Sequence, residues 1–99
     1  MNKTLWVDDI RNPPNSDFTV VRTYADAIKQ LETDQYDVIW LDHDLGDFSN
    51  GREYTGYDVV LWLCERKRNG GVVPNLYNML TSNPVGRTNM IRLIRRHLI

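Results

Sequence analysis

The sequence predicts an α/β domain built on a parallel sheet of four strands, and three observations support this fold class. Short apolar runs alternate with amphipathic stretches along most of the 99 residues. The run Asp37–Leu41 is apolar without alternation, which is typical of a strand that is covered on both faces. Capping residues precede the amphipathic stretches, as expected where a strand leads into a helix. A chain of this length forms one domain with one modest core, so we expect residues 1–99 to be a single domain.

Two strands and a helix are predicted before this central run. Thr4–Val7 is a short buried strand, and Phe18–Arg22 is a second strand because its residues are β-branched and apolar. Residues 11–17 contain two consecutive prolines and two asparagines, so we expect a loop there and not a helix. Thr23 then begins a helix, with Asp26 three residues later as in a capping box.

The elements after the central run continue the alternation. Gly46–Gly56 is polar and contains glycine, which predicts a flexible loop. Tyr57–Arg68 is a helix that ends at a pair of glycines, and Leu76–Leu80 is the fourth strand. Asn83 begins the last helix as its N-cap, with proline at the first helical position.

The order of these elements predicts how the strands lie in the sheet. Right-handed crossovers between parallel strands give the order 2-1-3-4 of a truncated flavodoxin-like fold, with three layers because helices cover both faces. Ligands of such sheets bind at the carboxyl ends of the strands, beside the switch point between strands 1 and 3. Those two strands are followed by acidic residues, Asp8-Asp9 and Asp42-His43-Asp44. Since neighbouring strands lie about 4.8 Å apart, we expect the four carboxylates to converge.

Four carboxylates at one place are costly unless a cation or shared protons compensate their charge. Oxygen ligands suit Mg²⁺ or another hard divalent cation, and the predicted metal ligands are Asp8, Asp9 and Asp42. One carboxylate could instead be a nucleophile toward phosphorus, or some of them could only cap loops or helices. Asp42 and Asp44 share one face if the chain stays extended, and His43 then points away. His43 could move a proton or only hydrogen-bond the loop.

A second polar segment follows the fourth strand and runs into the last helix. Free N–H groups and the helix dipole attract anions there, and Arg87 in the first turn could donate two parallel hydrogen bonds to a phosphate. A cation is slightly unfavourable at that end of a helix, which suggests an anionic partner. Plain capping by Asn83 is the alternative. The predicted phosphate-binding residues are Arg11, Thr81, Ser82, Asn83, Gly86 and Arg87.

Composition limits the remaining classes of function. A net charge of −1 gives no signal for nucleic acid or for a membrane surface. No apolar stretch is long enough to span a bilayer, and the N-terminus lacks a signal-peptide pattern. The chain has one cysteine, Cys64, which we expect to be a buried small hydrophobic residue. We therefore expect a soluble cytoplasmic protein.

Four motifs together resemble the cyclic-phosphate processing receiver-like domains, a divergent relative of response-regulator receiver domains. The motifs are Leu5-Trp6-Val7-Asp8-Asp9-Ile10-Arg11, Leu41-Asp42-His43-Asp44-Leu45-Gly46, Thr55-Gly56-Tyr57-Asp58 and Asn83-Pro84-Val85-Gly86-Arg87-Thr88-Asn89-Met90. The resemblance covers nearly the whole chain and implies a receiver-like fold that processes cyclic phosphate ends or cyclic nucleotides. It also implies that Asp8 and Asp9 hold Mg²⁺, that Asp42 matches the phosphate-accepting aspartate, and that Thr81 matches the hydroxyl residue after strand 4.

This sequence departs from the family pattern in two ways. The chain ends before a fifth strand, so the receiver lysine has no counterpart and Arg87 or Arg11 would supply its charge. The family often carries His-Ser-Ala-Asn-Pro where this chain has Leu80-Thr81-Ser82-Asn83-Pro84. If that histidine is an essential acid or base, Leu80 cannot replace it.

Two functions are consistent with these observations. The first is a metal-dependent phosphoesterase or phosphoryl-processing enzyme whose ligand is a phosphate-bearing small molecule or an RNA end. The second is a non-catalytic pseudo-receiver that binds a nucleotide or a protein partner, such as a host factor if the protein is phage-encoded and acts in the host cytoplasm. A phospho-accepting switch is disfavoured by the missing lysine. The resemblance also makes a homodimer plausible.

Overall fold

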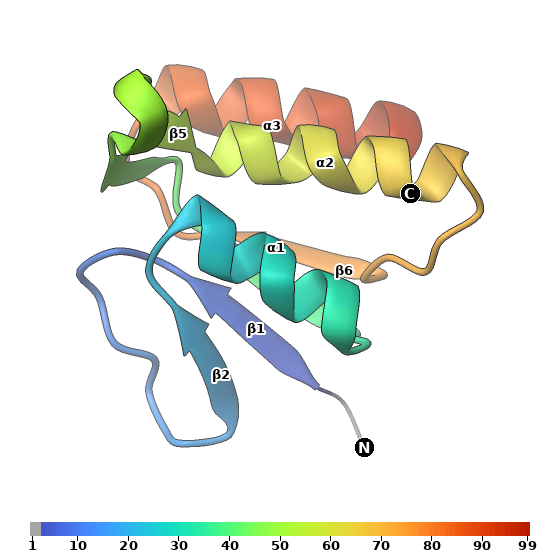
Figure 1. The fold of residues 1–99 in the computed structure, drawn as a ribbon, viewed down its shortest axis with the longest axis horizontal. Coiled ribbons are helices and arrows are strands. Elements are labelled where there is room, and N and C mark those ends of the chain that lie inside the picture. Colours follow the sequence, from blue (N-terminus) through green and yellow to red (C-terminus); the bar gives the residue numbers. More distant parts are fainter. Residues whose placement is uncertain (1–2) are drawn as a thin grey trace.

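The computed structural model describes residues 3–99 and confirms the predicted fold class and strand order (Figure 1). Four parallel strands form one sheet in the order β2-β1-β3-β6. Their bounds are Thr4–Val7 for β1, Phe18–Val21 for β2, Val38–Leu41 for β3 and Leu76–Met79 for β6. Because β6 is the fourth strand of this sheet along the chain, the order is the predicted 2-1-3-4.

The three helices are α1 (Tyr24–Thr33), α2 (Gly56–Arg68) and α3 (Pro84–His97). The predicted caps of α1 and α3 are present: the Thr23 hydroxyl accepts a hydrogen bond from the Asp26 amide, and the Asn83 side chain accepts one from the Gly86 amide. A capping box of Thr55 and Asp58 begins α2 one residue earlier than predicted. In the described part of the chain, none of the helices is long and apolar enough to cross a membrane.

The prediction of a flexible loop over Gly46–Gly56 is wrong. Strands β4 (Asp44–Asp47) and β5 (Tyr54–Thr55) form an antiparallel hairpin, with a 3₁₀ turn at Ser49–Gly51 between them. The buried Asp47 carboxylate stabilises the hairpin, because it accepts hydrogen bonds from the amide and hydroxyl of Ser49 and from the amide of Tyr24. A hairpin that is stabilised by a polar side chain accepting hydrogen bonds does not need alternating apolar residues. Its sequence therefore resembles that of a loop.

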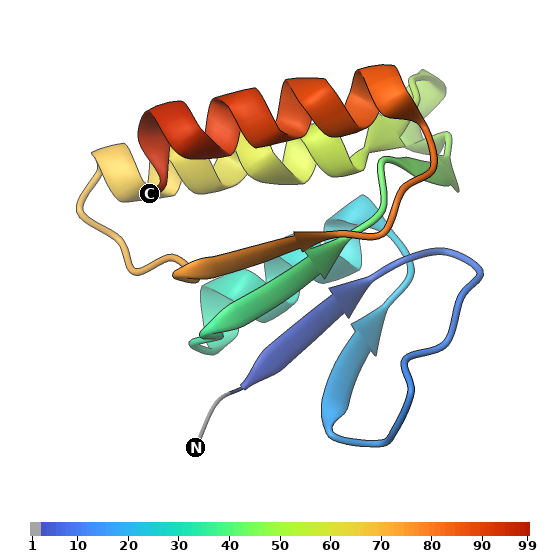
Figure 2. The ribbon, with the colours of Figure 1, turned by 180° about the vertical axis from the view of Figure 1, so that it is seen from behind.

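The core lies on one face of the sheet only. The residues of the four-stranded sheet that belong to the buried core all point to the same face. They are Leu5, Val7, Val21, Ile39 and Leu41. The same core contains residues from all three helices, such as Leu31, Leu63 and Met90. In Figure 2, no helix lies over the opposite face of the sheet.

The structure of residues 3–99 therefore has two layers, and the third layer expected from the sequence is absent. The crossovers from β2 to β3 and from β3 to β6 run in the same direction across the sheet. Because both are right-handed, they place α1 and α2 on the same side. Of the connections between strands, only the one from β1 to β2 runs the other way across the sheet, and it is the proline-containing loop instead of a helix.

An aromatic cluster packs on the face without helices. The ring centroids of Trp6 lie 5.4 Å from Phe18 and 5.7 Å from Trp40. Trp6 is only 5% exposed and donates its indole N–H to the carbonyl of Arg11, which follows β1. The cluster thus shields the centre of this face and holds the loop that leaves β1.

Candidate functional site

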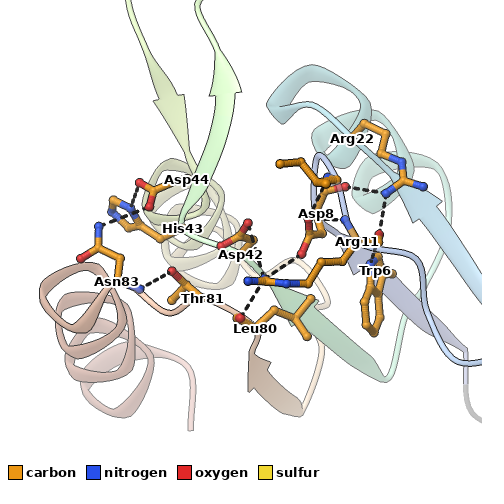
Figure 3. Close-up of polar contacts among 11 residues, drawn as sticks. Trp6, Asp8, Arg11, Arg22, Asp42, His43, Asp44, Leu80, Thr81 and Asn83 are labelled. Carbon is orange, nitrogen blue, oxygen red and sulfur yellow. Dashed lines mark hydrogen bonds and ion pairs between the residues drawn. The ribbon is translucent and has the colours of Figure 1, made fainter.

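The acidic residues after β1 and β3 meet because these two strands are neighbours in register. Val7 pairs with Leu41, and the Asp42 amide donates to the Val7 carbonyl at 2.9 Å. Asp8, Asp9 and Asp42 each offer one oxygen, and these oxygens lie within 4.8 Å of one another. The convergence expected at this edge of the sheet is therefore present for these three carboxylates, of which Figure 3 shows Asp8 and Asp42.

Asp8 is completely buried, and the turn that follows β1 is built around its carboxylate. Its Oδ1 accepts hydrogen bonds from the amides of Ile10 and Arg11, both at 2.9 Å. Its Oδ2 faces the Arg11 guanidinium at 3.2 Å. Each carboxylate oxygen has two lone pairs, so Asp8 keeps acceptor capacity toward the cleft.

Arg11 is the cation already present at this cluster, and Figure 3 shows its side chain between Asp8 and Asp42. Its Nη1 donates to the Leu80 carbonyl at 2.9 Å and lies 3.9 Å from Asp42 Oδ2. The Arg11 carbonyl is held by Arg22 Nη1 at 2.6 Å and by the Trp6 indole. The guanidinium contacts Asp8 and Asp42 and adds one positive charge to a cluster of three carboxylates, so it cannot compensate all of their negative charge.

Burial and the nearby negative charge alter the protonation of Asp42. Burial raises the pKa of Asp42, and the nearby charge of Asp8 raises it further. The amide of His43, the guanidinium of Arg11 and the hydroxyl of Thr81 act in the opposite direction without cancelling the rise. Asp42 thus binds a proton more readily than an ordinary aspartate, as expected for a carboxyl that lacks a full counter-charge.

An acid-lined cleft of about 520 Å³, which we call the acid cleft, surrounds these side chains. It is lined by Asp8, Asp9, Ile10, Arg11, Asp42, Asp44, Gly46, Glu53, Thr81 and Ser82. Five of these residues are acidic, and the only basic one among the described residues is Arg11. Sequence reasoning missed Glu53, because it reaches the cleft only when the unpredicted hairpin folds back, and its neighbours give no chemical signal.

His43 and Asp44 form a pair at the rim. His43 Nδ1 and Asp44 Oδ1 lie 2.9 Å apart, and Asn83 donates to Asp44 Oδ2 at 3.4 Å. The contact with His43 is the main reason that the pKa of Asp44 is lowered. Asp44 lines the acid cleft, as its predicted common face with Asp42 requires, whereas His43 is not among the cleft residues.

Two glycines allow the helices to approach the turn at Asp42 and His43. A Cβ atom on Gly56 would lie 2.0 Å from the Asp42 carbonyl oxygen, and one on Gly86 would lie 2.4 Å from Cγ of His43. The N-termini of α2 and α3 therefore press against this turn. Both glycines belong to motifs noted in the sequence. Their role in close packing depends on contacts with Asp42 and His43, which are distant in the sequence.

The predicted phosphate-binding residues divide into two groups. Arg11, Thr81 and Ser82 line the acid cleft, whereas Asn83, Gly86 and Arg87 do not. At the start of α3, the Gly86 amide donates to the Asn83 side chain and the Arg87 amide to the Asn83 carbonyl. Proline at the first position has no amide hydrogen. Capping by Asn83 thus uses most of the free donors, and the Arg87 side chain lines a different groove.

The separation of the carboxylates is suitable for a hard divalent cation. Ligand oxygens at about 2.1 Å from Mg²⁺ lie at most about 4.2 Å apart, and those at about 2.4 Å from Ca²⁺ at most about 4.8 Å. The three oxygens lie within 4.8 Å of one another, so one hard divalent cation could contact all three. The residues that would hold the ion are Asp8, Asp9 and Asp42.

Comparison with protein families gives one match. A family model described as the cyclic-phosphate processing receiver domain matches residues 3–96, which include every residue that lines the acid cleft. Comparisons with curated proteins and with solved structures give no match.

Proposed function

Because this chain belongs to the cyclic-phosphate processing receiver family, we propose that its acid cleft binds a divalent cation and hydrolyses a cyclic phosphate or a cyclic nucleotide. The observation that carries the proposal is the approach of Asp8, Asp9 and Asp42 to within 4.8 Å at the carboxyl ends of β1 and β3. Oxygen ligands at this edge of a parallel sheet suit a hard cation and a phosphate-bearing ligand.

The charge of the acid cleft favours a fixed order of binding. Five carboxylates and one guanidinium line it, so an anionic phosphate is repelled as long as no further cation is present. A divalent cation adds two positive charges and, when bound, polarises a phosphoryl oxygen and lowers the pKa of a bound water. We therefore expect phosphate ligands to bind measurably only when the cation is present.

The roles of the side chains follow from their positions. Asp42 lines the cleft and has a second carboxylate oxygen besides the one that would hold the cation, so we assign it the proton from an attacking water. The half-exposed guanidinium of Arg11 can donate to a phosphate oxygen from the Asp42 side of the cleft. Ser82 adds a hydroxyl donor, and the Thr81 hydroxyl, which contacts Asp42, could turn its proton to the ligand instead. His43 lies outside the cleft residues, so the proposal assigns the proton transfer to Asp42.

The test is turnover of 2′,3′-cyclic mononucleotides and cyclic dinucleotides with Mg²⁺ or Ca²⁺, followed by chromatography. We expect Asp42→Asn to lower turnover by about a hundredfold or more, because a general base contributes at least that much. Asp17→Asn is the matched control, since Asp17 is exposed and precedes β2 at the opposite end of the sheet. Unchanged turnover in Asp42→Asn would exclude this mechanism.

A non-catalytic binding module is the second candidate, and one observation favours it. Among the described residues that line the acid cleft there is no imidazole, and Leu80 contributes only its carbonyl, which binds Arg11. Calorimetry separates the two functions. Cation-dependent nucleotide binding without turnover supports the module, whereas binding of neither cation nor nucleotide points to a protein partner, such as a host factor for a phage-encoded protein.

A further inference from the structure

The outer edge of β6 is open. Its hydrogen bonds go to β3: the Leu76 amide donates to the Asp37 carbonyl and the Leu80 amide to the Leu41 carbonyl. In a parallel ladder, alternate residues direct their main-chain groups to opposite sides, so those of Tyr77 and Met79 face away from β3. No other strand of residues 3–99 pairs with β6. An edge of this kind can accept a further strand.

A groove of about 380 Å³ runs between this edge and α3, and we call it the α3 groove. Apolar side chains that are open to solvent line part of it: Leu76 is 53% exposed and Ile99 is 69% exposed. Ile91, at the middle of α3, adds a half-buried apolar surface. The groove therefore combines an unpaired backbone edge with apolar contacts, as a peptide that extends a sheet requires.

The charge of the α3 groove is positive. Arg87 and Arg95 line it on either side of Ile91, four residues apart in each direction, so they share one stripe of the helix. Among the described residues that line the groove, none is acidic. Neither arginine forms an ion pair within residues 3–99. A partner that brings carboxylates would complement this stripe.

We propose that the α3 groove binds an extended acidic segment of a partner protein, which adds a strand to β6. A second copy of the chain is disfavoured, because a two-fold interface contains the same patch from both copies and would bring Arg87 and Arg95 against themselves. A nucleic acid would match the arginines but would leave the amides and carbonyls of the edge unpaired. The exposed Leu76 and Ile99 also favour a polypeptide with alternating acidic and apolar residues.

The experiment uses a short peptide with blocked ends in which glutamate and valine alternate, added to the whole chain and followed by NMR. We expect shift changes confined to β6 and α3, and slower exchange of the Tyr77 and Met79 amides. A peptide of alternating lysine and valine should not bind. Arg95→Glu should weaken binding about tenfold, the effect of reversing one or two rim charge pairs. Arg96→Glu is the matched control, since it makes the same change one residue along and outside the groove.

Three outcomes would overturn the proposal. One is the absence of binding at millimolar peptide. Another is that Arg95→Glu and Arg96→Glu weaken peptide binding equally and also weaken the binding of a short single-stranded RNA equally. A diffuse basic surface for nucleic acid would then explain the arginines. The third is a concentration-dependent dimer that protects the β6 edge, which would make a second copy the occupant. Asp42→Asn should bind the peptide like the wild type, so failure here is separable from failure of the proposed function.

Discussion

The acid cleft and the α3 groove have opposite charge, although both are formed by residues 3–99. The cleft has five carboxylates against one guanidinium, while the described lining of the groove has two arginines and no acid. The sequence is segregated in the same way. All 13 acidic residues lie within the first 65 positions, and seven of the 12 basic residues lie after them. A net charge of −1 thus conceals two surfaces suited to different ligands.

The two regions also differ in how they are assembled. The acid cleft combines residues from the turns after β1 and β3, the hairpin and the segment after β6. It depends on close contact between these segments at Gly56 and Gly86. The α3 groove needs mainly one strand and the helix that follows it. Substitutions that disturb long-range contacts should therefore damage the cleft first.

The largest effect is expected from Gly56→Ala. The added Cβ would lie 2.0 Å from the Asp42 carbonyl oxygen, so α2 or the turn at Asp42 must move. We expect the free energy of unfolding to fall by about 3 kcal/mol or more, as for severe overpacking in a core. Urea denaturation followed by circular dichroism measures it.

Gly51→Ala is the control for this substitution. Gly51 has φ +77°, and a Cβ there would meet nothing within 4 Å, so only the backbone conformation opposes the change. Its expected cost is about 1 kcal/mol. Equal losses in the two variants would mean that the close approach at Asp42 does not hold the acid cleft together.

The next effect concerns the affinity for divalent cations. Asp9 is half-buried, and its carboxylate offers one of the three converging oxygens. Asp9→Asn should weaken Mg²⁺ and Ca²⁺ binding by about tenfold to a hundredfold, because a charged ligand is replaced by a neutral one. Calorimetry measures the affinity. Arg95→Gln in the α3 groove should leave it unchanged, and a comparable loss there would show that the two regions act as one electrostatic unit.

The dependence of stability on pH should reveal the effect of burial and of the neighbouring Asp8 charge on Asp42. The pKa of Asp42 is raised above its ordinary value of 3.8, so the folded state keeps a proton that the unfolded state loses. The contribution of Asp42 to stability is therefore full below pH 3.8 and is lost as the pH rises through its raised pKa. Asp44 acts in the opposite sense, because its pKa is lowered and its contribution is lost as the pH falls.

Asp42→Asn isolates the first of these two contributions. The stability of the variant relative to the wild type should increase from pH 3.8 upward and then level off above the raised pKa. Urea titrations of both proteins across this range measure the difference. Saturating Ca²⁺ should reduce the advantage of the variant, since the cation stabilises the charged carboxylate of the wild type. A difference that does not change with pH would mean that Asp42 titrates normally.

The sequence was sufficient for the acid cluster because strand ends can be recognised locally. Apolar runs marked the ends of β1 and β3, and the handedness of crossovers placed these strands side by side. The meeting of Asp8, Asp9 and Asp42 then needed no further information. The hairpin was missed because the hydrogen bonds of Asp47 stabilise it, and Glu53 was missed with it.

The expected third layer shows a different limit. A sheet wound on both sides needs a helix between β1 and β2, and the two consecutive prolines there already predicted a loop. The prediction of helices on both faces came from the general pattern of the fold, although the sequence has no helix between β1 and β2. The α3 groove also could not be predicted from the sequence. Its strand edge, apolar contacts and arginines come together only when α3 packs beside β6.

The smallest predicted effect tests whether the arginines of the α3 groove serve folding. Arg87 lies in the first turn of α3, where the positive end of the helix dipole disfavours a cation and no acidic residue is present. Arg87→Glu should therefore raise the free energy of unfolding by about 0.5 kcal/mol. Arg96→Glu, in the last turn, should lower it by a similar amount, because the dipole has the opposite sign there.

Thermal denaturation of both variants at low salt measures these small changes, and added salt should reduce them. If Arg87→Glu stabilises the protein, the positive charge of Arg87 opposes folding. The arginine would then be favourable only when an anionic group is bound beside it. A destabilising result would assign Arg87 a structural role on the surface of α3. The interpretation of the α3 groove as a second ligand site, opposite in charge to the acid cleft, would then be weaker.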